Sequence, residues 1–542
     1  MTAVEGLLSM AVLKDKCLPQ TTHQRIEHIH ESLLFYDEHT FGASESVSDP
    51  LCENSQVQWG EKSAYAWEAV KRTQMLYETS VGLLQGDLRR GKNPTLTIFN
   101  TLNWKRSEML TVYIDFEVIP RNQFFEITDF QGHSLKVQPI RYRREGCYYA
   151  IFAEDIPPMG YKTFEIVFKQ PSTDTGTITI NNASIENHFY KLQLNPDKGT
   201  IQSLYDKELN CELVDSSSPW ELGAFIYEKL GNRDQLAQYR LDDYNRTGLS
   251  ECRIIDSSNG PIYQRILLQG KSPGTDEAFG VNLEIKLYHD TKRIELEYAI
   301  KRLPETDPSG IYVAFPFQLP EGKLAFDVQG GTVISGKNQL EGTSTDWNTV
   351  QNFVSVQNNQ AQIIIGSSLI PLYQLGDINL GKFQYQKQYE RPHVYSWVMN
   401  NYWNTNFKAS QEGEFRWSYH LTSSVDPSSN LATKFGWSSR IPLYARVMPT
   451  GTENHKPTEY SAFHFEKDNF LMTSCTPSKE EGYILLNIRE IDGKRTNLRI
   501  LNEDGQTIPF TIVNAIEEKL ENETSEHIFE GYQNKFIKIK RF

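Results

Sequence analysis

The spacing of apolar residues separates a helical first part of the chain from a much longer part made of strands. Before Arg90, apolar residues recur at helical intervals in two stretches, residues 26–36 and 66–84. This spacing predicts two antiparallel helices. The polar stretch between them, residues 37–58, is longer than a plain helix connection, and we therefore expect a functional loop there.

From Thr95 onward, apolar residues alternate with polar ones, and this period of two is typical of strands. Clusters of turn-forming residues separate the strands, for example Asn195-Pro-Asp-Lys-Gly199 and Ser257-Ser-Asn-Gly260. Runs of strands with almost no helical spacing between them favour antiparallel sandwiches over a parallel sheet with crossover helices. We predict a mainly β chain, in which an N-terminal helical segment is followed by several antiparallel β-sandwich domains.

Two linker-like stretches divide the strand part of the chain. Residues 170–176 separate a small β unit from a larger one, and residues 449–457 separate the larger unit from a terminal one. A length of 542 residues also suggests several domains. We expect a helical part at residues 1–92, a small sandwich at 93–172, a large sandwich at 177–450 and a C-terminal β domain at 451–542.

Charge and composition disfavour several classes of partner. The 55 Lys and Arg residues against 69 Asp and Glu residues give a formal charge of −14, which argues against nucleic acid and anionic membranes as partners. No apolar run approaches the roughly 20 residues that cross a bilayer. The six cysteines contain no C-x-x-C pair, and the motifs of phosphate transfer, dinucleotide binding, serine hydrolysis and zincin chemistry are absent. We expect a soluble, cytoplasmic protein.

The segment Tyr36-Asp-Glu-His-Thr-Phe-Gly-Ala-Ser44 holds the densest group of candidate metal ligands. Two carboxylates beside the imidazole of His39 suit a divalent metal such as zinc, and a neighbouring acid could orient the ring. From these residues alone, a helix end is the favoured interpretation, in which His39 meets the negative end of the helix dipole while Asp37 and Glu38 are solvated. A metal site would need further ligands from outside this segment.

A second cluster, residues 400–407, combines asparagine amides with the rings of Tyr402 and Trp403. Flat rings cover the apolar face of a sugar, and amides act as donors and acceptors for its hydroxyl groups. A strand and turn whose Asn residues bond the backbone explains the same composition equally well. Asp346-Trp-Asn-Thr-Val-Gln351 is a weaker candidate, because an aromatic residue beside an acid in a β protein is usually core next to surface.

Several stretches together resemble the C-terminal portion of one family, the α-mannosidases of glycoside hydrolase family 38. Tyr36 to Ser44 is similar to the end of that family's catalytic domain and its helical bundle, and Leu96 to Ser107 resembles the start of its first β domain. Gly199 to Glu208 resembles the opening of its large sandwich. The order of these stretches makes the resemblance specific. It implies that the largest sandwich is a galactose-mutarotase-like super-sandwich.

The resemblance implies part of a zinc-dependent retaining α-mannosidase that hydrolyses terminal α-mannosides of glycans or oligosaccharides. His39 would be the final ligand of one zinc ion shared with a catalytic barrel, and Glu38 is the alternative if the register differs by one residue. The residues expected to contact the mannose-containing substrate are Asn401, Tyr402, Trp403 and Asn406. The family's other zinc ligands, its nucleophile and its acid lie in an N-terminal barrel, so we assign no catalytic residue here. We expect this polypeptide to be inactive without such a barrel.

Two other classes of function stay open. Large sandwiches with Trp, Tyr and Asn loops can retain a glycan without hydrolysing it, which would make the chain a non-catalytic carbohydrate-binding β-sandwich protein. A purely structural remnant would bind neither metal nor glycan. A reading frame just upstream that encodes a barrel would favour the enzyme. The sequence also leaves open whether the chain forms a homo-oligomer.

Overall fold

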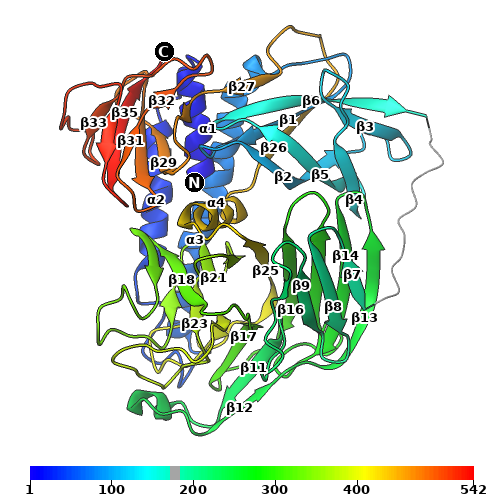
Figure 1. Cartoon of the computed structure of the whole chain (residues 1–542), viewed down its shortest axis with the longest axis vertical. Coiled ribbons are helices and arrows are strands. Elements are labelled where there is room, and N and C mark those ends of the chain that lie inside the picture. The colour runs from blue at the N-terminus through cyan, green and yellow to red at the C-terminus, as the bar shows by residue number, and fades with distance from the viewer. Residues whose placement is uncertain (171–182) are drawn as a thin grey trace. The chain divides into compact units, whose positions relative to one another are not determined.

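The computed structural model describes residues 1–170 and 183–542, and most of its regular elements are strands (Figure 1). The linker predicted at residues 170–176 lies, from residue 171 onward, outside the described residues. The chain forms two compact units. The first comprises Met1–Asp37, Ala64–Gly176 and Ile441–Phe542, and the second comprises Glu38–Ser63 and Thr177–Arg440.

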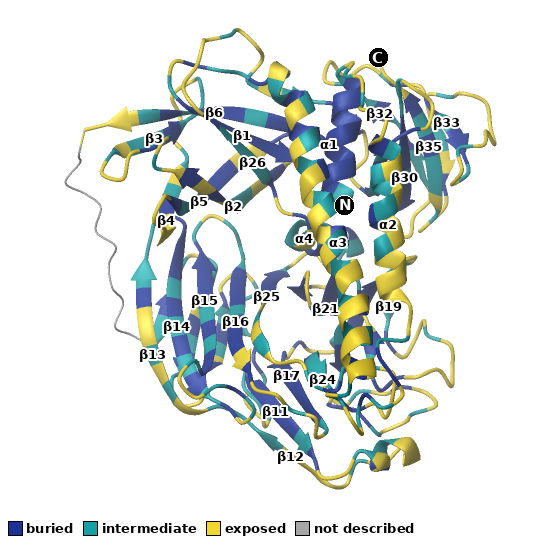
Figure 2. Ribbon diagram, turned by 180° about the vertical axis from the view of Figure 1, so that it is seen from behind, coloured by how far each residue is buried: buried dark blue, intermediate teal, exposed yellow. Residues whose placement is uncertain are grey.

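Three helices occupy the N-terminal part of the chain: α1 (Thr2–Leu13), α2 (Thr22–Asp37) and α3 (Glu53–Leu84). The last two are the helices that the sequence predicts. The spacing gave no sign of α1, because its residues from Ala3 to Leu13 are buried on every side and leave no one-sided apolar stripe. Figure 2 shows α1 as buried, whereas α2 and α3 carry many exposed positions. None of the helices in the described part of the chain is long and apolar enough to span a membrane.

The first unit contains a β-sandwich and a group of C-terminal sheets. In the sandwich, β26, β1, β6, β27 and β3 form one sheet and β2, β5 and β4 form another, around a core that includes Ile98, Ile151 and Phe164. The C-terminal sheets share a second core with α1, which packs against β29 and β30. The strands of this unit are β1 (Thr95–Asn100), β2 (Arg106–Asp115), β3 (Phe124–Thr128), β4 (Lys136–Tyr142), β5 (Gly146–Ile156), β6 (Gly160–Lys169), β26 (Tyr444–Met448), β27 (Glu459–Ser461), β28 (His464–Phe465), β29 (Phe470–Pro477), β30 (Tyr483–Glu490), β31 (Thr496–Leu498), β32 (Ile500–Leu501), β33 (Thr511–Val513), β34 (His527–Phe529) and β35 (Asn534–Lys540).

The second unit is a large sandwich with a nine-stranded sheet (β13-β14-β15-β16-β25-β22-β21-β18-β19) and a six-stranded sheet (β12-β11-β17-β24-β23-β20). A four-stranded sheet (β10-β9-β8-β7) and helix α4 (Ser429–Arg440) complete it. Its strands are β7 (Ser184–Glu186), β8 (Tyr190–Asn195), β9 (Thr200–Asp206), β10 (Cys211–Glu212), β11 (Phe225–Leu230), β12 (Tyr244–Thr247), β13 (Ser250–Asn259), β14 (Tyr263–Lys271), β15 (Val281–Tyr288), β16 (Ile294–Arg302), β17 (Ser309–Phe315), β18 (Lys323–Val328), β19 (Gly331–Ile334), β20 (Asn348–Thr349), β21 (Phe353–Gln357), β22 (Gln362–Gly366), β23 (Leu372–Leu375), β24 (Val394–Asn400) and β25 (Gly413–Ser424).

The period of two along these strands builds the core of the large sandwich. Leu283, Ile285 and Leu287 of β15 face a core that also takes Phe315 from the six-stranded sheet and Leu192 from the four-stranded sheet. Neighbouring strands of the two large sheets run antiparallel. The prediction of a mainly β chain with antiparallel sandwiches, the largest of them a super-sandwich, is therefore confirmed.

The outer face of the six-stranded sheet carries a second apolar layer, which positions the candidate site. Ile226 of β11, Tyr312 of β17 and Trp397 of β24 pack there against Tyr402, which lies just beyond the end of β24. The Tyr312 and Trp397 rings are stacked, with their centroids 5.9 Å apart. The loop that starts at Asn401 is thus held over this face of the sheet.

Candidate functional site

The structure brings together the two clusters that the sequence singles out, although more than half of the chain separates them. The backbone N–H of Phe41 donates to the carbonyl of Asn406 at 2.9 Å. The Thr405 hydroxyl donates to the carbonyl of Ser44 at 3.2 Å. We call residues 38–44 the His39 segment and residues 401–410 the Asn401 loop. Both belong to the second unit, and together they form the candidate site.

Gly42 lets the two segments approach this closely. A Cβ atom at this position would lie 2.7 Å from Nε1 of Trp59, in α3, and 3.1 Å from the carbonyl oxygen of Phe407. The Nζ of Lys408 lies 5.7 Å from the centroid of the Trp59 ring, within cation–π range. The first turns of α3 therefore lie against both the His39 segment and the Asn401 loop.

His39 is highly exposed, with 92% of its side chain accessible to solvent. Its Nδ1 lies 2.7 Å from Oε1 of Glu38. The other carboxylate oxygen of Glu38 accepts the N–H of Thr40 at 3.0 Å and lies 3.3 Å from Nζ of Lys62. Desolvation by itself would raise the pKa of Glu38, but the hydrogen bonds from Thr40 and Lys62 outweigh it and lower the pKa. A charged Glu38 can therefore orient the imidazole and leave its other nitrogen directed outward.

The described residues contain no group of three or more His, Cys, Asp or Glu side chains that could hold a metal ion. Zinc sites in proteins use at least three protein ligands. His39 and Glu38 suit an imidazole ligand with a carboxylate behind it, but they do not make a complete zinc site. The zinc ligand role of His39 thus stays a prediction, and any such centre needs ligands from outside the described residues.

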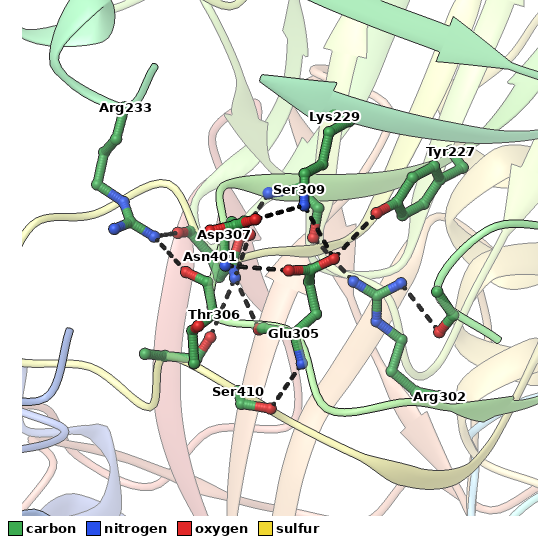
Figure 3. A network of polar contacts seen from close by, with 12 residues as sticks. Tyr227, Lys229, Arg233, Arg302, Glu305, Thr306, Asp307, Ser309, Asn401 and Ser410 are labelled. Atoms are coloured by element: carbon green, nitrogen blue, oxygen red, sulfur yellow. Dashed lines mark hydrogen bonds and ion pairs between the residues drawn. The ribbon is translucent and has the colours of Figure 1, made fainter. Parts of the chain in front are cut away.

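Asn401 is buried, and its side chain is fully used within the fold (Figure 3). Its Nδ2 donates to the carbonyls of Glu305, Asp307 and Ala409 at 2.9–3.0 Å. Its Oδ1 accepts the backbone N–H of Ser309 at 2.6 Å. The amide therefore ties the start of the Asn401 loop to the turn between β16 and β17.

Charged side chains reinforce the same attachment (Figure 3). Nζ of Lys229 lies 3.0 Å from carboxylate oxygens of both Glu305 and Asp307. Desolvation opposes the charge on Lys229, but the two carboxylates outweigh it and raise the pKa of its ammonium group. Arg233 donates to the carbonyl of Asn401 at 2.9 Å, so that β11 and the segment after it also hold the loop.

Tyr402 points away from solvent. Its hydroxyl donates to Oε1 of the buried Glu228 at 2.7 Å, and Nε of Arg246 lies 2.5 Å from the other carboxylate oxygen. Burial is the main cause that raises the pKa of the Tyr402 hydroxyl well above its ordinary value. The hydroxyl thus remains a neutral donor within the fold.

Trp403 and Asn406 occupy the outer side of the same loop. Trp403 is 53% exposed, and its ring meets that of Trp347 edge to face at a centroid distance of 6.0 Å. Trp347 in turn contacts Trp397 at 5.8 Å. Asn406 is exposed and adopts a φ of 61°, in the left-handed region that asparagine tolerates better than most residues. The substrate-binding role predicted for the four loop residues stays a prediction, and Trp403 and Asn406 are the two whose side chains face outward.

Known proteins resemble this chain in part of its sequence and in its fold. Residues 185–383 match the family model described as the glycosyl hydrolases family 38 C-terminal domain. The resemblance to the C-terminal portion of family 38 is confirmed. The search of curated proteins finds no match for the chain.

Two solved structures share the fold over nearly the whole chain. An α-mannosidase from Enterococcus faecalis V583 is 13% identical, with a TM-score of 0.74, over 99% of this chain and 66% of that chain. A protein in the glycosyl hydrolase family 38 from Enterococcus faecalis is 13% identical, with a TM-score of 0.73, over 99% of this chain and 68% of that chain. This chain therefore spans 66% of the length of the first of these structures.

The whole length of a galactose mutarotase-like protein from Lactobacillus casei ATCC 334 matches 46% of this chain. That protein is 13% identical, with a TM-score of 0.28.

Proposed function

We propose that this chain is the C-terminal part of a zinc-dependent retaining α-mannosidase that hydrolyses terminal α-mannosides of glycans or oligosaccharides. The observation that carries the proposal is the pairing of the His39 segment with the Asn401 loop, which puts a candidate zinc ligand beside an exposed tryptophan. The family 38 match and the fold of the Enterococcus faecalis α-mannosidase support it.

In this proposal His39 supplies one zinc ligand, and Glu38 fixes the orientation of the ring through Nδ1. A bound zinc ion would offer Lewis-acid coordination to sugar hydroxyl groups. A retaining mechanism also needs two carboxyl groups about 5 Å apart on opposite sides of the glycosidic bond. Asp37 and Glu38 are neighbours at the end of α2, and we assign neither of them this role. The catalytic carboxylates and the remaining ligands would come from a separate catalytic domain.

An exposed apolar surface on the first unit supports such a partner domain. Leu34 of α2 and Trp67 of α3 are each 72% exposed. Phe35 of α2 and Tyr65 of α3, which are also exposed, stack on each other with ring centroids 5.3 Å apart. Exposed apolar patches that join several large side chains usually mark an interaction surface. We propose that this surface faces the catalytic domain.

Trp403 would contact the substrate. An indole ring that is half exposed and backed by further rings offers a rigid flat face for the apolar side of a sugar. The side-chain amide of Asn406, on the same outer side of the loop, would meet hydroxyl groups.

The experiment is reconstitution with a separately expressed family 38 catalytic domain and zinc. Hydrolysis of an aryl α-mannoside is measured for this chain, for the catalytic domain and for their mixture. We expect substantial activity only in the mixture. Activity of this chain alone would contradict the shared zinc centre, and no gain on mixing would contradict the proposed role in hydrolysis.

A non-catalytic carbohydrate-binding protein is the second candidate, favoured by the exposed Trp403 on a rigidly held loop. It predicts that the chain alone binds mannose oligosaccharides equally well with and without zinc. The enzyme proposal predicts weak binding by the chain alone and a strong dependence on zinc in the mixture.

A further inference from the structure

A cavity of about 310 Å³ lies between two loops of the second unit, in a region that the proposed mannosidase site does not use. One loop lies between β19 and β20, and the other lies between β23 and β24. Its volume is at the lower end of the range that small-molecule sites occupy in proteins, which is roughly 300–1,000 Å³. The cavity can therefore take a ligand of about the size of one sugar.

Bonds between the two loops fix the walls of this cavity. Nε2 of Gln386 donates to Oε1 of Glu341 at 2.6 Å, and the N–H of Gly342 donates to the carbonyl of Tyr385 at 3.0 Å. Gly342 has a φ of +77°, and its missing Cβ leaves room for the Tyr385 ring. The walls are thus formed before any ligand arrives.

The segment Asp346–Gln351, which the sequence marks as a weak candidate, supports the same cavity from behind. Gln339 lines the cavity, and its Nε2 donates to Oδ1 of Asn348 at 3.0 Å. Thr345 lines it as well, directly before Asp346. This segment therefore supports a wall of the cavity through Asn348, while its Trp347 backs Trp403 of the candidate site.

Lys387 is the unusual member of the lining. Its neighbours Gln386 and Gln388 are exposed, whereas only 8% of Lys387 is accessible. Its Nζ lies 5.6 Å from the centroid of the Tyr389 ring. Within residues 1–170 and 183–542, the structure shows no hydrogen bond or ion pair for this ammonium group, so it is open to an acceptor in the cavity that it lines.

The charged groups around Lys387 are Asp346, Asp377 and Lys382. Burial lowers the pKa of Lys387 to about 8, Asp346 and Asp377 oppose this shift, and Lys382 adds to it. Asp377 is already paired with Lys382 at 2.8 Å, and burial raises the pKa of Asp346. An incoming anion would therefore find an ammonium group that no neighbouring carboxylate neutralises by direct contact.

We propose that this cavity binds a small anionic polyol, such as a sugar acid or a sugar phosphate, with Lys387 as the partner of its negative charge. Lys337 adds a second positive charge to the lining, and Glu341, whose Oε1 accepts from Gln386, adds one negative charge. The amide of Gln388 and the hydroxyl of Thr345 supply the polar groups that meet hydroxyls, and the Tyr385 ring offers an apolar face. The proposal does not depend on the mannosidase function.

The test is isothermal titration calorimetry of the full chain with gluconate and with glucose 6-phosphate, which separate a carboxylate from a phosphate ligand. Neutral glucose is the control ligand. We expect at least one of the two anions to bind about ten-fold more tightly than glucose, a difference that one charge-assisted contact supplies. Lack of binding by both anions, or equal binding of glucose, would overturn the proposal.

Two further measurements assign the charge to Lys387. Lys387→Met should weaken anion binding about ten-fold, whereas Lys382→Met, on the same loop but outside the lining, should change it less than about two-fold. If Lys387→Met does not fold, the pH dependence of anion binding by the wild-type chain tests the same role. Because the pKa of Lys387 is about 8, its ammonium group loses its charge as the pH rises through that value. The affinity for the anion should therefore fall about ten-fold between about pH 6.5 and about pH 9. Affinity that is constant over this range would contradict the role of Lys387.

Discussion

Asn401 and Tyr402 are followed in the same loop by Trp403 and Asn406, yet the two pairs have opposite environments. The first pair is buried and bonded to distant strands, and the second pair is exposed. Each pair contains one amide and one aromatic ring, so the residue types alone do not distinguish them. A cluster with the composition of a sugar site can therefore have two parts. Here Asn401 and Tyr402 hold the loop in place and form its scaffold half, and Trp403 and Asn406 are exposed and form its contact half.

Asn401→Ala, in the buried pair, should have the largest effect on the free energy of unfolding. The substitution removes the four hydrogen bonds of the Asn401 side chain and leaves the N–H of Ser309 without its acceptor, while the bond from Arg233 to the backbone carbonyl of residue 401 remains. We expect the free energy of unfolding to fall by about 3 kcal/mol. Urea denaturation measures it, and Asn404→Ala, at an exposed position of the same loop, should change it by less than about 0.5 kcal/mol.

Gly42→Ala tests how closely the His39 segment must approach the loop. The new Cβ would meet Nε1 of Trp59 at 2.7 Å, so we expect a loss of about 2 kcal/mol in the free energy of unfolding. Gly60→Ala is the matched control, because Gly60 lies in α3 with nothing within 4 Å of the added Cβ. It should stabilise the chain by up to about 1 kcal/mol. Equal effects of the two substitutions would contradict the packing described for Gly42.

Tyr402→Phe removes one donor from Glu228 but keeps the ring in the apolar layer. Glu228 retains Arg246 and the hydroxyl of Tyr312, which donates at 3.1 Å. We therefore expect the free energy of unfolding, measured by urea denaturation, to fall by only about 1 kcal/mol. Tyr239→Phe, at a side chain that is 67% exposed, should have no measurable effect. A loss of binding to mannose oligosaccharides without a loss of stability would instead make Tyr402 a contact residue.

Trp403→Ala should have the smallest effect on stability and the clearest effect on binding. Because the ring is 53% exposed, we expect the free energy of unfolding to change by less than about 0.5 kcal/mol. In the reconstituted enzyme, KM for a mannose oligosaccharide should rise about ten-fold as the stacked face is lost. An unchanged KM would remove Trp403 from the proposed contact half of the loop.

Much of the fold could be predicted from the sequence, because alternation along strands such as β15 follows directly from one buried face. Helix α1 could not, since burial on every side erases the helical stripe. The sequence could likewise propose the His39 segment and the Asn401 loop as separate clusters. Their contact depends on single backbone bonds such as that from Phe41 to Asn406, for which the sequence contains no local signal.

The sequence also does not indicate which residues of the Asn401 loop face inward. Glu305 and Ser309, two of the residues that bond Asn401, lie more than 90 residues away, between the end of β16 and the start of β17. Glu228, the acceptor for Tyr402, is the only acid of β11, and nothing in that strand marks it as the partner of a residue so far along the chain. Lys387 was missed for a different reason, because nothing in a polar loop sequence marks the one lysine that the fold buries.

The central claim is that His39 is a zinc ligand in a centre completed by another domain. The most direct measurement is the zinc content of the complex with a family 38 catalytic domain, determined by mass spectrometry after gel filtration. His133 provides a matched control, because it is also exposed and has its Nδ1 2.9 Å from a carboxylate, that of Asp129. We expect the wild type and His133→Ala to retain zinc and His39→Ala to lose it. Full zinc retention by His39→Ala would contradict the role of His39 as a zinc ligand.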